Sequence, residues 1–89
     1  MGEVNTPIDV ISICSSDGKI RPLRFRLERE NRERLRVNID KILSTRRVPY
    51  VGVEADIFLC RAMVDGAEQI FELKYAIRSH CWFLTQRVY

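Results

Sequence analysis

Four arginines are the residues whose type and spacing point most directly to chemistry. They alternate with apolar residues in two short segments and are Arg24, Arg26, Arg34 and Arg36. A guanidinium is a planar, permanently charged donor that suits phosphates and carboxylates. If the two segments are strands of one hairpin, the four side chains share a face, because alternate strand residues point to the same side. The pattern therefore predicts a binding site for nucleic acid or for an acidic protein surface.

The same face also carries acidic residues, so it is mixed. Glu28 shares it, and Asp40 is a further candidate. No aromatic residue is expected among the arginines on this face, whereas surfaces that stack single-stranded bases usually carry aromatic residues between the basic ones. An ordinary solvated face is therefore the alternative interpretation.

Three carboxylates form a second group. Glu54 and Asp56 lie two residues apart, and Glu72 falls on a neighbouring predicted strand. Such a trio could bind a cation or carry out acid–base catalysis in a hydrolase-like enzyme. The carboxylates could equally pair with Lys74 and Arg61 on a wet sheet face, which is the interpretation we favour. We therefore assign no catalytic residue.

The single histidine and the three cysteines do not match a catalytic or metal-binding pattern. His80 is next to Cys81, where a predicted strand begins, and adjacent strand residues point to opposite faces, so the two form no nucleophilic pair. Cys14 and Cys60 are remote in sequence and lack the spacing of a zinc site. We expect no metal and no cofactor, packing in the interior for His80, and three buried free thiols in a reducing compartment.

Length and composition indicate one small folded domain. The chain has 89 residues, of which 46% are hydrophobic and 30% charged, with a net charge of +3. We expect a flexible tail over residues 1–7 and a single domain over residues 8–89. No uncharged stretch approaches the length of a membrane span, so we expect a cytoplasmic protein without a membrane partner.

The period of two predicts an all-β fold, a six-stranded antiparallel meander closed into a small SH3-like or OB-like barrel. The expected strands span residues 8–14, 19–28, 34–39, 51–64, 70–77 and 81–88. Residues 40–45 fit either one short helical turn or a bent strand. Asp-Gly pairs at Asp17–Gly18 and Asp65–Gly66 predict tight hairpin turns.

The hairpin register follows from the apolar residues. Pairing Leu27 with Leu35 puts Leu23 on the same buried face and sets Arg26 opposite Arg36. Like charges directly opposite each other destabilise a sheet unless an anion lies beside them, and such local conflicts tend to occur at functional surfaces.

The two C-terminal hairpins can be aligned in the same way. The Asp65–Gly66 turn sets Phe58 opposite Leu73, and the following turn sets Tyr75 beside Trp82. We therefore expect Trp82 to be buried among aromatic residues.

Residues 20–89 also resemble a known group of proteins. The matching segments are Pro22-Leu23-Arg24-Phe25-Arg26, Val37-x-x-x-x-Ile42-Leu43, Phe71-Glu72-Leu73-x-Tyr75 and Trp82-x-Leu84-x-x-Val88-Tyr89. In this order they resemble short uncharacterised bacterial proteins of unknown function. The resemblance implies a bacterial, cytoplasmic origin and supplies no activity to carry over.

Taken together, these features predict a non-catalytic binding module that uses the arginine-rich hairpin. The alternative is a structural or interaction protein that pairs through an exposed strand edge or forms a homodimer.

Overall fold

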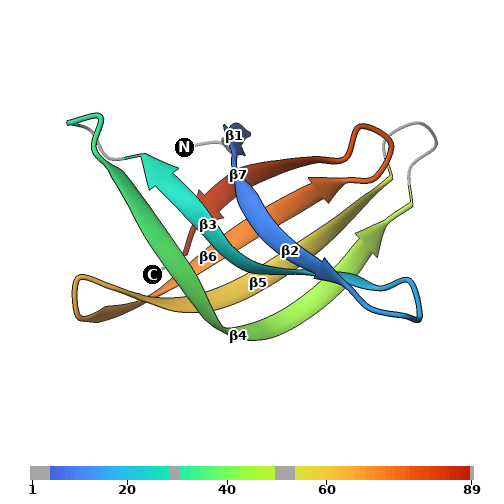
Figure 1. Cartoon of the computed structure of the whole chain (residues 1–89), viewed down its shortest axis with the longest axis horizontal. Coiled ribbons are helices and arrows are strands. Elements are labelled where there is room, and N and C mark those ends of the chain that lie inside the picture. Colours follow the sequence, from blue (N-terminus) through green and yellow to red (C-terminus); the bar gives the residue numbers. More distant parts are fainter. Residues whose placement is uncertain (1–4, 29–30, 50–53, 89) are drawn as a thin grey trace.

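Seven antiparallel strands form one strongly curled sheet (Figure 1). The computed structural model describes residues 5–28, 31–49 and 54–88, and these residues contain strands and turns but no helix. The strands are β1 (Thr6–Ile8), β2 (Val10–Cys14), β3 (Ile20–Glu28), β4 (Arg34–Val48), β5 (Ala55–Val64), β6 (Ala67–Ala76) and β7 (Cys81–Arg87). The strand order is β1-β7-β6-β5-β4-β3-β2, a half-barrel. The all-β prediction is confirmed.

The expected count of six strands is wrong because the N-terminal segment divides at Asp9. β1 pairs with β7 and β2 pairs with β3, so these two short strands form the opposite ends of the sheet. Only Asp9 separates them, and its carbonyl accepts a hydrogen bond of 3.1 Å from the Arg26 N–H. Thr6 and Pro7, which we expected in the tail, belong to β1. The chain thus links the two edges of the curled sheet.

Residues 40–45 form the bent middle of β4, so the option of a helical turn is wrong. The pairing of β4 with β5 shifts between Ile39 and Lys41 and again between Ile42 and Ser44. Each shift adds a residue to one strand, which bends it and changes which residues face inward. Leu43 consequently points to solvent. The long bent β4 connects the two halves of the half-barrel.

The predicted registers of three hairpins are confirmed. In the β3–β4 hairpin, Leu27 lies opposite Leu35 and Arg26 opposite Arg36. The β5–β6 and β6–β7 pairings match the prediction as well. Gly66 adopts a φ of 78°, the left-handed conformation that a tight hairpin turn requires.

Leu23 is a correction to the predicted buried face. The pairing of β2 with β3 shifts between Ile11 and Ser12, which leaves one extra residue on β3. Pro22 on one side of this bulge is buried, and so is Phe25 on the other side, while Leu23 is 41% exposed. A bulge reverses the inward–outward alternation, so a period of two cannot be extended across it.

The core fills the concave side of the sheet. Its buried residues are Phe25, Leu27, Val37, Phe58, Cys60, Ala62, Val64, Phe71, Leu73 and Trp82. Phe25 and Phe71 meet edge to face with their ring centroids 5.2 Å apart. They come from β3 and β6, which are not neighbours in the sheet. This contact therefore packs one half of the curl against the other.

The cysteines and the histidine correct another expectation. Cys60 is buried as predicted, but Cys14 and Cys81 are exposed, and all three are free thiols. His80 is exposed in the β6–β7 turn, where its Nδ1 lies 2.9 Å from the Tyr75 hydroxyl. Cys14 is the last residue of β2 and Cys81 is the first residue of β7, so both exposed cysteines lie next to turns.

We expect a thiol reagent to modify Cys14 and Cys81 in the native protein and Cys60 only after unfolding. Burial raises the pKa of the Cys60 thiol to about 12, so the reactive thiolate is scarce at neutral pH. Alkylation with and without denaturant, followed by mass spectrometry, measures this. Modification of Cys60 at the rate of the other two in native protein would contradict its burial.

Candidate functional site

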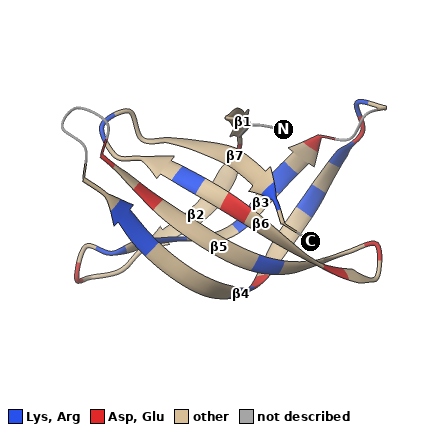
Figure 2. Cartoon of the chain, turned by 180° about the vertical axis from the view of Figure 1, so that it is seen from behind, with Lys and Arg blue, Asp and Glu red and all other residues tan. Residues whose placement is uncertain are grey.

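The β3–β4 hairpin presents Arg24, Arg26, Arg34 and Arg36 on its convex surface, and we call these four residues the arginine face. Figure 2 shows the basic bands on β3 and β4. The arginines alternate with buried residues such as Phe25 and Val37, which hold the hairpin onto the core. β5 pairs with β4 only from Ile39 onward. The end of the hairpin is therefore a two-stranded ribbon that extends beyond β5.

The arginine face carries little internal charge compensation. Arg26 lies 3.6 Å from the Asp9 carboxylate, and both side chains are largely exposed, at 53% and 80%. Exposed pairs of this kind stabilise a protein by about 0–1 kcal/mol. Within the described residues, no carboxylate forms an ion pair with Arg24, Arg34 or Arg36. Glu28 is the cross-strand neighbour of Arg34, so Arg24 and Arg36 are the charges most available to an anionic partner.

The three predicted carboxylates do not come together. Asp56 faces the concave side and pairs with Arg47, whereas Glu72 pairs with Arg46 at 3.8 Å and accepts a hydrogen bond from the Thr85 hydroxyl. Glu54 lies near Arg78 instead. The pairing partners we expected, Lys74 and Arg61, are thus replaced by other arginines. The described residues hold no cluster of three or more metal-binding side chains.

Apolar side chains border the arginine face on β2. Ile11 is 50% exposed and lies directly opposite Arg24, with Ile13 and Leu23 close to it in the same two strands. β2 ends the strand order, so it has a free edge among the described strands. This edge is the surface that the alternative of strand pairing would use.

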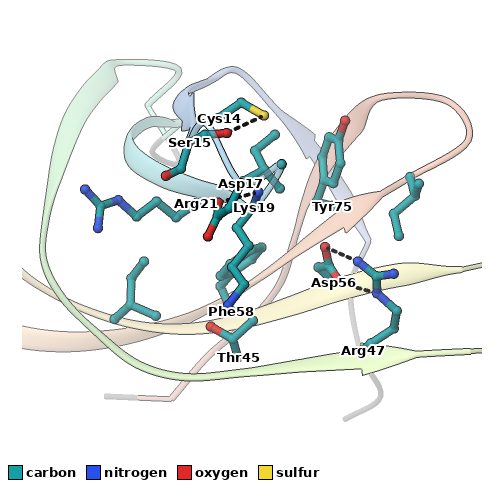
Figure 3. Close-up of a pocket in the computed structure, with 14 residues that line it drawn as sticks. Cys14, Ser15, Asp17, Lys19, Arg21, Thr45, Arg47, Asp56, Phe58 and Tyr75 are labelled. Carbon is teal, nitrogen blue, oxygen red and sulfur yellow. Dashed lines mark hydrogen bonds and ion pairs between the residues drawn. The ribbon is translucent and has the colours of Figure 1, made fainter.

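A cavity that the sequence did not reveal opens at the other end of the half-barrel (Figure 3). We call it the mouth cavity. Its volume is about 770 Å³. The β2–β3 turn forms one wall, and the concave sides of β4, β5 and β6 form the floor. Its lining residues are Cys14, Ser15, Asp17, Gly18, Lys19, Ile20, Arg21, Ile42, Thr45, Arg47, Asp56, Phe58, Tyr75 and Ile77.

An ion pair between an exposed arginine and a buried carboxylate organises the floor of the mouth cavity. Arg47 donates from Nε and Nη2 to the two Asp56 carboxylate oxygens, at 2.8 and 3.3 Å. Asp56 is only 9% exposed. Its carboxylate accepts the hydrogen bond and attracts the positive charge, which raises the pKa of the Arg47 guanidinium. The pair fixes a carboxylate beside the aromatic rings of Phe58 and Tyr75.

Comparisons with known proteins identify no relative of this chain. No protein-family model, no curated protein and no solved structure matches the chain. The described part of the chain contains no helix that is long and apolar enough to cross a membrane. The case for a function therefore rests on the geometry of the arginine face and the mouth cavity.

Proposed function

We propose that this protein is a non-catalytic binding module whose arginine face contacts the phosphate backbone of a nucleic acid duplex. The observation that carries the proposal is the pairing of Arg26 with Arg36, with Arg24 and Arg34 on the same surface. Like charges opposite each other cost stability in the free protein. A row of phosphates would turn this cost into favourable charge-assisted hydrogen bonds.

The shape of the hairpin favours a duplex over a single strand. Its end is a two-stranded ribbon, and the major groove of B-form DNA admits such a ribbon. The described neighbours of the arginines on this surface include Ile11 and Asn38, with no aromatic ring for stacking an unpaired base. A protein that contacts only the sugar–phosphate backbone binds with little dependence on base sequence.

The type of barrel and the cellular setting are part of the same proposal. An SH3-like or OB-like barrel is supported by the curled antiparallel sheet around one core. A bacterial, cytoplasmic setting is supported by the segments quoted above.

Arg36→Thr should weaken duplex binding and stabilise the free protein. Removing one charge of the opposed pair should raise the free energy of unfolding by about 0.2–1 kcal/mol. Arg36 is the better choice than Arg26, because Arg26 would also lose its contact with Asp9. Fluorescence anisotropy with a labelled DNA duplex measures affinity, and urea unfolding measures stability.

Arg78→Thr is the matched control, since it removes the same charge from an exposed side chain in the β6–β7 turn, remote from the arginine face. It should leave duplex affinity nearly unchanged. If both variants lost the same amount of duplex affinity, the effect would come from net charge alone, and the proposal would be contradicted. If the protein bound an acidic protein but no duplex, the partner of the arginine face would be a protein and not a nucleic acid.

The exposed edge of β2 favours one second candidate function, homodimerisation by strand pairing. Ile11 and Ile13 there are exposed apolar residues on an edge strand. Edge pairing depends weakly on salt, whereas phosphate binding weakens steeply as salt rises. Sedimentation of the wild type and of Ile13→Lys would separate the two, because the edge model predicts a dimer that the substitution dissociates.

A further inference from the structure

The mouth cavity combines the features of a small-ligand site that is separate from the arginine face. A cavity of about 770 Å³ falls within the range of pockets that hold drug-sized molecules. Its floor combines the aromatic side chains of Phe58 and Tyr75, from two adjacent strands, with the Arg47–Asp56 ion pair. The cavity is open at the mouth of the half-barrel and flanked by charged groups. It therefore suits a ligand with one flat apolar part and one charged part.

The rim of the cavity carries two positive side chains, Lys19 and Arg21, and one carboxylate, Asp17. Lys19 lines the cavity, and Figure 3 shows its side chain pointing from the β2–β3 turn toward Phe58 and Thr45. Among the described residues, neither Lys19 nor Arg21 forms an ion pair. The Asp17 carboxylate accepts a hydrogen bond from the Lys19 backbone N–H. The Lys19 ammonium is therefore free to bind an anionic group of a ligand.

The floor supplies hydrogen-bond acceptors. Asp56 uses its two carboxylate oxygens to hold Arg47, and each oxygen retains a second lone pair. The Thr45 hydroxyl lies on the adjacent strand, opposite Phe58. Acceptors beside an aromatic surface match a planar ring that carries N–H donors.

We propose that the mouth cavity binds a nucleoside monophosphate. The base packs against the exposed part of Tyr75, beside the buried Phe58, with its N–H donors toward Asp56. The phosphate accepts hydrogen bonds from the Lys19 ammonium. This proposal does not rest on the proposed function, because the arginine face lies on the convex surface of the β3–β4 hairpin.

Trp82 provides the measurement. It is the one tryptophan of the chain, and its ring centroid lies 4.8 Å from that of Tyr75 and 5.6 Å from that of Phe58. AMP should shift Trp82 fluorescence saturably, and calorimetry on the same samples detects binding that leaves the fluorescence unchanged. Adenosine and ribose 5-phosphate, each with half of the ligand, should bind about tenfold or more weakly than AMP.

Lys19→Gln tests the phosphate contact without disturbing the core, since Lys19 is exposed in the turn region. The substitution should weaken the affinity for AMP about tenfold and leave the affinity for adenosine unchanged. Lys41→Gln is the matched control, because Lys41 is an exposed lysine of β4 that does not line the cavity. Arg36→Thr should also leave AMP affinity unchanged, so failure of duplex binding and failure of this proposal are separate results. Absence of saturable AMP binding, or equal losses in Lys19→Gln and Lys41→Gln, would overturn it.

Discussion

Trp82→Ala should lower the free energy of unfolding by about 3–5 kcal/mol, the usual cost of truncating a large buried aromatic residue. Trp82 is 8% exposed and packs against Phe58 and Tyr75. Each aromatic contact adds about 0.5–1.5 kcal/mol beyond the burial of apolar area. A small domain has little stability in reserve, so a large fraction of the protein should unfold at room temperature. Urea unfolding followed by far-UV circular dichroism measures the loss, because the variant lacks the tryptophan.

Phe83→Ala is the neighbouring control on the opposite face of β7. Phe83 is half-buried and lies 5.2 Å from the Lys74 Nζ. Its truncation should cost only about 1–2 kcal/mol, because a part-exposed side chain loses less burial. A Trp82→Ala loss no larger than that of Phe83→Ala would mean that Trp82 is not part of the core.

Phe71→Ala should be comparably destabilising, by about 3–5 kcal/mol. Phe71 is fully buried, and its edge-to-face contact with Phe25 joins β6 to β3 across the concave side. Loss of this ring should also loosen the β3–β4 hairpin, whose backbone amides should then exchange with solvent faster than those of β5. Urea unfolding and hydrogen exchange measure the two effects.

A double-mutant cycle with Phe25→Leu and Phe71→Leu isolates the contact itself. We expect a coupling energy of about 0.5–1.5 kcal/mol. Leucine keeps most of the apolar volume, so both single variants should fold. Strictly additive losses of unfolding free energy would show that the two rings stabilise the protein independently. Their contact would then not stabilise the curled shape of the sheet.

The hairpin registers could be predicted because they depend on local patterns. In the β3–β4 hairpin, apolar alternation and a short loop admit one pairing, and the opposition of Arg26 and Arg36 follows from it. For the left-handed position of the loop, the sequence allows Asn31 or Arg32, with asparagine tolerating it better, and Arg32 has the positive φ of 66°. Residues 29–30 of that loop lie outside the described residues.

The other features could not be predicted because they depend on bulges and on long-range packing. One extra residue in β3 turns Leu23 outward, and two shifts in β4 decide that Arg47 faces Asp56. From the sequence alone, we expect Arg21, Arg46 and Arg47 near the rim of the arginine face. Arg46 and Arg47 instead pair with carboxylates of β5 and β6, and Arg21 lines the mouth cavity.

The mouth cavity forms where the β2–β3 turn lies over β4, β5 and β6, segments far apart in the sequence. No pattern within any single segment indicates that meeting. The sequence indicates Asp56 as a carboxylate and Tyr75 as a partner of Trp82, but it places neither residue in a cavity.

The salt dependence of duplex affinity tests the central claim most directly. For wild-type protein, the logarithm of affinity should fall linearly with the logarithm of salt concentration, with a slope of about 0.9 for each phosphate contact. A variant with threonine at Arg24, Arg26, Arg34 and Arg36 should bind weakly and show a nearly flat dependence, while the Arg78→Thr control keeps the wild-type slope. An unchanged slope in the fourfold variant would contradict binding through the arginine face.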